Sequence, residues 1–161
     1  MSLQSWMGAN LETQGYCLSE PQQRSLRVGL RFSTGVCLAL TAAALALQWA
    51  PGFVALAAIG AVAGFSSRHP FDHVWNLGIR HLFDAPPLPP SPPRRRHAFK
   101  VATVMMAGEA ALLFAGASTA AIVLGVVILG SCSAVTATNL CIPSVALSLL
   151  ERRTRRAQPV T

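Results

Sequence analysis

Two long stretches of the chain contain almost no charged residue, and this feature limits the possible folds more than any other. No Asp, Glu, Lys or Arg lies between Arg31 and Arg68, and only Glu109 lies between Lys100 and Glu151. A soluble domain usually carries about 25% charged residues, whereas this chain has 12%. Apolar windows of this length are typical of membrane-spanning helices. We therefore expect an all-α membrane protein.

Each apolar stretch contains a turn, so each predicts a hairpin of two transmembrane helices. Pro51-Gly52 interrupts the first stretch, and the small residues 116–119 interrupt the second. Within a membrane domain of residues 30–150, we expect four spans, at about 30–49, 53–67, 98–117 and 120–139. The second offers roughly 22 Å of helix at 1.5 Å per residue. It is short for a hydrocarbon core of about 30 Å.

A polar connector, residues 68–97, joins the two hairpins. From Pro70 to about Phe83 its pattern predicts an amphipathic helix lying in the membrane interface. The proline-rich run 86–93 predicts an extended strap of polyproline type.

The two ends of the chain are polar as well. We expect irregular structure over residues 1–19 of an N-terminal arm, 1–29, and a helix start at Ser19-Glu20-Pro21. A basic tail, residues 151–161, follows the membrane domain.

All 13 Lys and Arg residues fall on one side of this topology. They lie in the arm, the connector and the tail, whereas the two opposite turns have none. Because positive residues favour the cytoplasmic side, we expect both termini and the connector to be cytoplasmic. We expect no nucleic-acid partner despite the net charge of +7, since no basic face interleaved with aromatic residues exists. Anionic lipid headgroups or protein partners are expected at Arg94, Arg95, Arg96, Arg152 and Arg153.

Glu109 is the one charged residue expected deep inside a span. A carboxyl group there costs several kcal/mol unless it is neutral or partnered. It could form a proton or cation site, or contact a bound partner. Alternatively, it is a protonated acid bonded to a hydroxyl on a neighbouring helix, such as that of Thr41 or Ser131.

The cysteines offer a second candidate site, made of Cys132, Cys141 and perhaps Cys37. No C-x-x-C motif exists, and a straight helix would turn Cys132 and Cys141 to opposite sides. Pairing them requires the interruption at 139–143 to fold the chain back. The alternative is that the cysteines are small buried residues, kept reduced on the cytoplasmic side.

Two further patterns are weaker. His69 and His73 are four residues apart and could share a helix face to hold zinc or haem, but no third ligand stands at a useful spacing, so we expect no metal. Gly60 and Gly64 form a G-x-x-x-G pair that allows close helix packing, either within their own hairpin or with another subunit.

Four motifs together resemble the DUF4395 family of bacterial integral membrane proteins, a domain of unknown function. They are RFS at 31–33, HPFDHVWNLGIRHLF at 69–83, PPLPPSPPRRRHAFK at 86–100 and CIPS at 141–144. The likeness covers about residues 30–150. Family members usually carry Asn at the position of Ser33, and many carry a further cysteine where this chain has His97. The resemblance implies a multi-pass protein of a bacterial inner membrane and no particular activity or cofactor.

Three hypotheses for function follow. The first is an accessory or structural subunit of an inner-membrane complex with other membrane protein subunits, because no catalytic motif is evident. The second is a thiol-redox or sulfur-handling protein that uses Cys132 and Cys141. The third is a small transporter with Glu109 as its intramembrane site. The cofactor, the partner and the oligomeric state stay undetermined by the sequence.

Overall fold

The computed structural model describes residues 3–157, with side chains for residues 5–151, and this part of the chain is helical without a strand. The helices are α1 (Leu3–Thr13), α2 (Glu20–Ala46), α3 (Ala50–Phe65), α4 (Pro70–Leu77), the 3₁₀ helix η1 (Ile79–Phe83), α5 (Pro93–Phe114), α6 (Ser118–Thr138) and α7 (Ile142–Ala157). The expected all-α fold is therefore confirmed.

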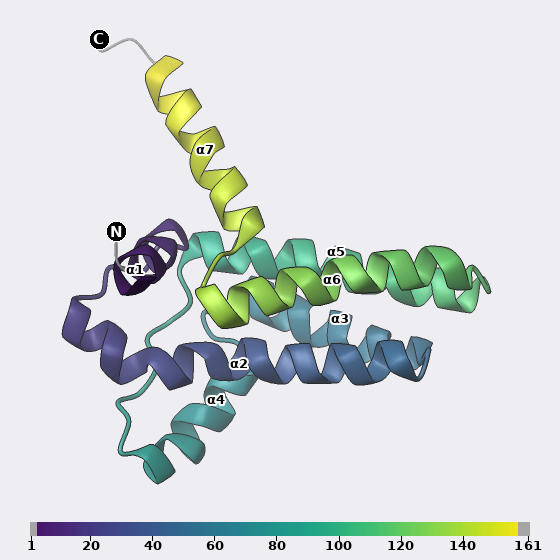
Figure 1. The fold of residues 1–161 in the computed structure, drawn as a ribbon, viewed down its shortest axis with the longest axis horizontal. Coiled ribbons are helices and arrows are strands. Elements are labelled where there is room, and N and C mark those ends of the chain that lie inside the picture. The colour runs from purple at the N-terminus through teal and green to yellow at the C-terminus, as the bar shows by residue number, and fades with distance from the viewer. Residues whose placement is uncertain (1–2, 158–161) are drawn as a thin grey trace.

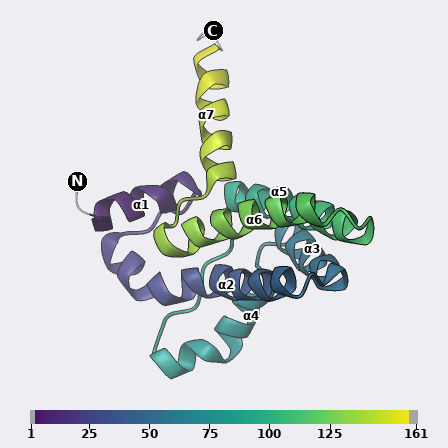
Figure 2. The same cartoon turned by 45° about the vertical axis from the view of Figure 1, so that its right-hand side comes forward.

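Four helices, α2, α3, α5 and α6, run side by side and form a bundle (Figures 1 and 2). The turns between α2 and α3 and between α5 and α6 lie at one end. Helices α1 and α4 and the start of α7 lie toward the other end, and α7 leaves the bundle at a steep angle (Figure 1). Helices α2, α5 and α6 are each long and apolar enough to cross a membrane. Helix α3 qualifies only together with α4, to which it is bent by 79°.

Small and apolar residues build the centre of the bundle. Phe53 of α3 is completely buried and packs in one cluster with Met106 of α5 and Ile128 of α6. Burial of a large apolar side chain stabilises a fold by about 1.5–3 kcal/mol relative to water. In a lipid environment, close packing contributes in place of this transfer term.

The N-terminal segment differs from the expectation of irregular structure, because residues 3–13 form α1. Two polar side chains around its end explain the helix. Asn10 Nδ2 donates to Thr138 O at 2.9 Å, and Gln14 Nε2 donates to Asn139 O at 2.6 Å. These carbonyl groups end α6, where the backbone lacks partners of its own. The order of α1 thus depends on contacts more than 120 residues away in the chain.

The start of α2 lies where the sequence predicted it. Ser19 is the N-cap, Pro21 stands in the first turn, and the Ser19 backbone N–H donates to Gln22 Oε1 at 2.9 Å. The helix then continues without a break to Ala46. One continuous helix therefore contains both the basic turns around Arg24 and Arg27 and the apolar segment.

The connector helix is divided in two at Gly78, where α4 ends and η1 begins. The proline-rich strap behind it is held at Leu88, which is buried. Leu88 N donates to Asn76 Oδ1 at 2.7 Å, and Arg68 Nη1 donates to Leu88 O at 2.7 Å. The strap ends where α5 begins.

Candidate functional site

A cluster of buried polar side chains lies at the end of the bundle that carries the connector. Its members come from the segment after α1, from α2, from the start of α4 and from α5. We call it the buried polar centre and define it as Tyr16, Ser33, Cys37, His69, Asp72 and Arg95. Five of the six are at most 5% exposed, and Cys37 is partly buried. Polar groups at such depth need partners, so each contact is informative.

Asp72 joins two segments of this centre, α2 and the start of α4. Its Oδ1 accepts a short hydrogen bond from Ser33 Oγ of α2, and its Oδ2 accepts one from the His69 backbone N–H at 3.2 Å. The second bond is half of a capping box, in which His69 is the N-cap and Asp72 the third helical residue of α4. Asp72 therefore both starts α4 and ties it to α2.

Arg95 is the positive member of the centre. Its Nη1 donates to Tyr16 Oη at 2.6 Å, its Nη2 donates to Leu30 O at 3.4 Å, and its guanidinium lies 5.5 Å from the ring centroid of Tyr16 and 5.6 Å from that of Phe99. Arg95 also lies close enough to Asp72 for their charges to interact. Each buried charge thus has an opposite charge nearby, which a buried ion needs.

This position corrects the expectation that Arg95 docks lipids or partners together with Arg94 and Arg96. Arg95 is 5% exposed and faces inward. Successive residues of an α-helix point about 100° apart, because 3.6 residues complete a turn. Three consecutive arginines therefore cannot share one face. Arg94 instead pairs with Glu151 of α7 at 2.5 Å, and Arg152 and Arg153 have side chains outside the described residues.

His69 faces Cys37 but is not arranged as its base. The Cys37 Sγ and His69 Nε2 atoms are 3.7 Å apart, and His69 Nδ1 accepts from the Phe71 backbone N–H at 3.2 Å. Burial lowers the pKa of His69 to about 4; the Asp72 carboxylate partly offsets this effect and the Arg95 cation adds to it. The neutral ring then carries its proton on Nε2 and offers that proton to sulfur. It has no lone pair there to take the thiol proton.

His73 does not join His69. It is exposed on α4, whereas His69 is buried. Among the residues that the structure describes, no three His, Cys, Asp or Glu side chains gather in a way that could hold a metal ion. The reason lies in Pro70, since His69 precedes the helix and caps it instead of sharing a face with His73.

Three of the four cysteines lie around the buried polar centre. Cys37 of α2 lies near Cys132 of α6, and Cys132 in turn lies near Cys141. The chain folds back between α6 and α7, where Asn139 adopts the left-handed conformation with φ 59°. Cys17 is exposed, and all four thiols are free in the structure.

Glu109 of α5 is completely buried, and neither carboxyl oxygen has a hydrogen-bond partner among the described residues. The hydroxyl of Thr41 on α2 is likewise buried without a partner. Each residue stands five positions before the end of its helix, at the end of the bundle away from the connector. The expected bond between Glu109 and a neighbouring hydroxyl is therefore not formed.

Gly60 and Gly64 of α3 pack against α5. A Cβ atom at Gly60 would lie 2.8 Å from Thr103 Oγ1, and one at Gly64 would lie 2.8 Å from Lys100 Cγ and 3.3 Å from Lys100 N. The contact is within the chain, and its partner is α5 instead of α2, the other helix of the hairpin.

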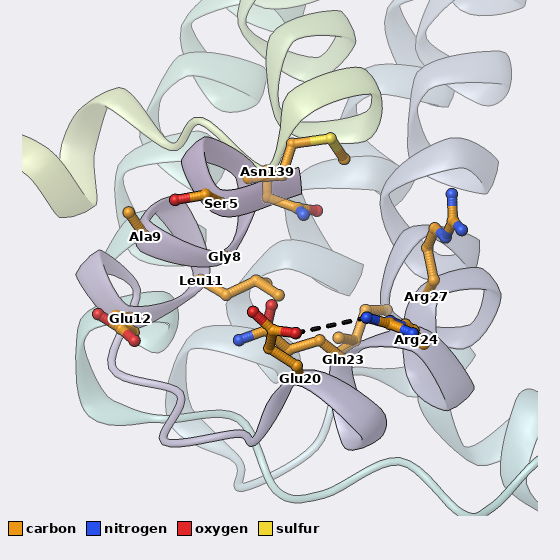
Figure 3. Close-up of a pocket in the computed structure, with 12 residues that line it drawn as sticks. Ser5, Gly8, Ala9, Leu11, Glu12, Glu20, Gln23, Arg24, Arg27 and Asn139 are labelled. Carbon is orange, nitrogen blue, oxygen red and sulfur yellow. Dashed lines mark hydrogen bonds and ion pairs between the residues drawn. The ribbon is translucent and has the colours of Figure 1, made fainter. Parts of the chain in front are cut away.

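A pocket of about 360 Å³ lies between α1 and α2 (Figure 3). Glu12 and Glu20 line it together with Arg24 and Arg27, and an exposed ion pair of 3.4 Å joins Arg24 to Glu20. Its charges balance, so it favours neither anions nor cations. It contains none of the site residues that the sequence predicted.

Ser33, Asp72 and Tyr16 were not predicted from the sequence as site residues. Two local signals were available for the first two, namely the Ser of RFS and the Asp that follows His69-Pro70 at the capping-box spacing. Neither signal shows that Ser33 and Asp72 meet, because 39 positions separate them. Tyr16 has no local signal at all.

Comparison with known proteins gives one match. The family described as "Domain of unknown function (DUF4395)" matches residues 27–152. No curated protein and no solved structure matches the chain. The matched range includes every member of the buried polar centre except Tyr16.

Proposed function

Because the chain belongs to the DUF4395 family, a domain of unknown function, we propose its role from its own residues: an integral protein of a bacterial inner membrane, with four spans in two hairpins. The observation that carries the proposal is the position of the charges in the fold. The two turns that connect α2 with α3 and α5 with α6 contain no Lys or Arg, and all 13 such residues belong to the segments at the other end. This distribution supports cytoplasmic termini and a cytoplasmic connector.

Reporter fusions test this topology directly. A reporter that is active only outside the cytoplasm, fused after Gly52 or Ser118, is expected to be active. The same reporter fused after Asp84, in the connector, is expected to be silent. Activity in the reverse pattern, or a chain that stays soluble without detergent, contradicts the proposal.

We propose an accessory or structural role in a membrane assembly as the leading function. The support is the set of side helices at the charged end, which expose large apolar residues beyond the bundle. Leu77 is 81% exposed, Leu82 82% and Ile142 58%. Exposed apolar residues gathered beside charges are typical of interaction surfaces. Purification from native membranes in a mild detergent is expected to bring a partner protein along, and migration as a lone 17.0 kDa chain argues against this role.

A thiol-redox or sulfur-handling function is the second candidate, and the convergence of Cys37, Cys132 and Cys141 favours it. Its chemistry would need two of these thiols to pair, since His69 supplies no base. Alkylation of the purified protein, with and without prior oxidation, tests the idea. Loss of labelling at two of the three after oxidation supports it, provided that exposed Cys17, the internal control, stays labelled. If all three thiols stay free after oxidation, the idea is excluded.

A transport function centred on Glu109 is the third candidate, supported by a buried carboxyl group that has no hydrogen-bond partner in the described part of the chain. Inside a membrane such a group is expensive and is therefore a reasonable site for a proton or cation. Replacement of Glu109 by Gln keeps the shape and removes the ionisable group. Flux into vesicles should then cease, whereas unchanged flux removes Glu109 from consideration.

A further inference from the structure

A basic groove lies where the end of α3 meets the first turns of α5 and the side of α7. Its volume is about 340 Å³, and its lining includes Phe65, Arg94, Arg96, His97, Lys100 and Leu147. Glu151 is the one acid on the lining, and it forms an ion pair with Arg94. The groove thus keeps an excess of positive charge in Arg96 and Lys100.

The backbone adds to this positive potential. Helix α5 begins at the groove with Pro93, and its N-cap, Pro92, provides no side-chain hydrogen bond. The N-terminal end of a helix carries a partial positive charge and binds anions such as phosphate. The Nε atom of Arg96 is also buried and has no hydrogen-bond acceptor among the described residues. An anion with several oxygen atoms would be attracted by the positive potential that Arg96, Lys100 and the helix end create together.

One wall of the groove is apolar. Phe65, the last residue of α3, is 75% exposed, and the Lys100 Nζ lies 4.5 Å from the centroid of its ring. Gly64 lets α3 and α5 approach closely just behind this pair. Leu147 of α7 lines the groove as well. A small soluble anion would make no apolar contact with this exposed aromatic ring at the end of an apolar helix. A lipid has an acyl chain that can pack against it.

We propose that the basic groove binds the phosphate of an anionic phospholipid, with Arg96 and Lys100 on the headgroup and Phe65 against the start of an acyl chain. The inference rests on the proposed membrane topology, which sets this end of α3 and α5 at the level of the cytoplasmic headgroups. In that position basic residues attract anionic lipid electrostatically.

The test is native mass spectrometry of the purified, delipidated protein in detergent, titrated with phosphatidylglycerol or with zwitterionic phosphatidylcholine. The wild-type chain should bind phosphatidylglycerol at least tenfold more tightly than phosphatidylcholine. The double variant Arg96→Gln/Lys100→Gln should lose most of this preference. The control, Arg24→Gln/Arg27→Gln, removes the same charge from two exposed residues at the same end of the bundle and should change the affinity less than about threefold.

Three outcomes overturn the proposal. An equal loss in both double variants means that only the overall surface charge matters. Equal binding of both lipids means that no anion is selected. Displacement of the lipid by inorganic phosphate means that the groove holds a soluble anion.

Folding and topology are controlled separately. The helix content and elution profile of each variant report folding, and the single variant Lys100→Gln, at an exposed position, replaces the double variant if that one aggregates. The reporter fusions at Gly52 and Ser118 do not depend on these residues. A correct topology with unchanged lipid preference therefore refutes the groove alone, whereas an inverted topology refutes the proposed function.

Discussion

His69 Nε2 points at the Cys37 thiol from 3.7 Å while the other ring nitrogen of His69 accepts from the Phe71 backbone N–H. A cysteine and a histidine are the residue types of a nucleophile and its base, but the two side chains are not arranged as such a pair. In a working pair the nitrogen next to sulfur must be able to accept a proton. Here the Phe71 bond uses Nδ1 as an acceptor, so the neutral ring keeps its proton on the side of Cys37. The contact binds α2 to the start of α4 and does not activate the thiol.

The first prediction concerns the bond between Ser33 and Asp72. Replacement of Ser33 by Ala should destabilise the protein by about 1–3 kcal/mol, because it leaves a buried carboxylate oxygen without its donor. Thermal unfolding in detergent, followed by circular dichroism, measures the effect. The matched control is Ser25→Ala in the same helix, whose hydroxyl is exposed and donates to Gln22 O at 3.1 Å. A similar decrease in melting temperature in both variants would show that the hydrogen bond from Ser33 to Asp72 adds no particular stability.

The second prediction is a pH dependence that originates at His69. Its pKa is about 4 in the folded chain and 6.5 when unperturbed. Between these values the unfolded chain binds a proton that the folded chain does not, so stability falls as the pH is lowered from 6.5 toward 4. Below that window the loss is complete, and above it His69 contributes no pH dependence. Asp72, Arg95 and Cys37 face the ring, and burial is the dominant cause of the shift.

The variant His69→Asn isolates this contribution. Asn is a good N-cap, so α4 keeps its start while the titrating ring is removed. The fall in melting temperature between pH 6.5 and 4 should therefore be smaller in His69→Asn than in the wild type. His81→Asn changes an exposed histidine and should keep the full wild-type slope. The two variants differ only in which histidine is replaced, so the difference between the two slopes reports His69. Identical slopes would contradict the prediction.

Features that depend on residues close together in the sequence were predicted, whereas features that depend on residues far apart in the sequence were missed. The charge-poor stretches predicted helices α2, α3, α5 and α6 because composition and local turns act over a few residues. Helix α1 was missed because its order depends on Asn10 and Gln14 reaching the end of α6. The buried polar centre was missed for the same reason, since Arg95 and Tyr16 are 79 positions apart. Arg95 was misassigned because three adjacent arginines look alike until the helix is placed against its neighbours.

The third prediction tests the close approach of α3 to α5. Gly64→Ala places a methyl group 2.8 Å from Lys100 Cγ and 3.3 Å from its backbone nitrogen. The two helices must move apart, and overpacking of this kind costs about 1–3 kcal/mol. Gly130→Ala is the control, because no atom lies within 4 Å of a Cβ there. Alanine favours the helix over glycine by about 1 kcal/mol, so this variant should melt at the same or a higher temperature. A stable Gly64→Ala protein would mean that the interface adapts freely.

The last prediction concerns the effect of Glu109 on the stability of the protein. A buried carboxyl group without a hydrogen bond carries a desolvation cost, so Glu109→Met, of similar length and apolar, should stabilise the protein by about 1–3 kcal/mol. Thr41→Val removes a buried hydroxyl that also lacks a partner among the described residues and should stabilise the protein by less. The measurement is again thermal unfolding in detergent, and an unchanged or lower melting temperature for Glu109→Met would mean that the carboxyl group makes a stabilising bond.

A residue that lowers stability where an apolar one fits is best explained by function, since stability is commonly given up at functional sites. A stabilised Glu109→Met protein that has also lost flux therefore favours the transport hypothesis over the accessory role.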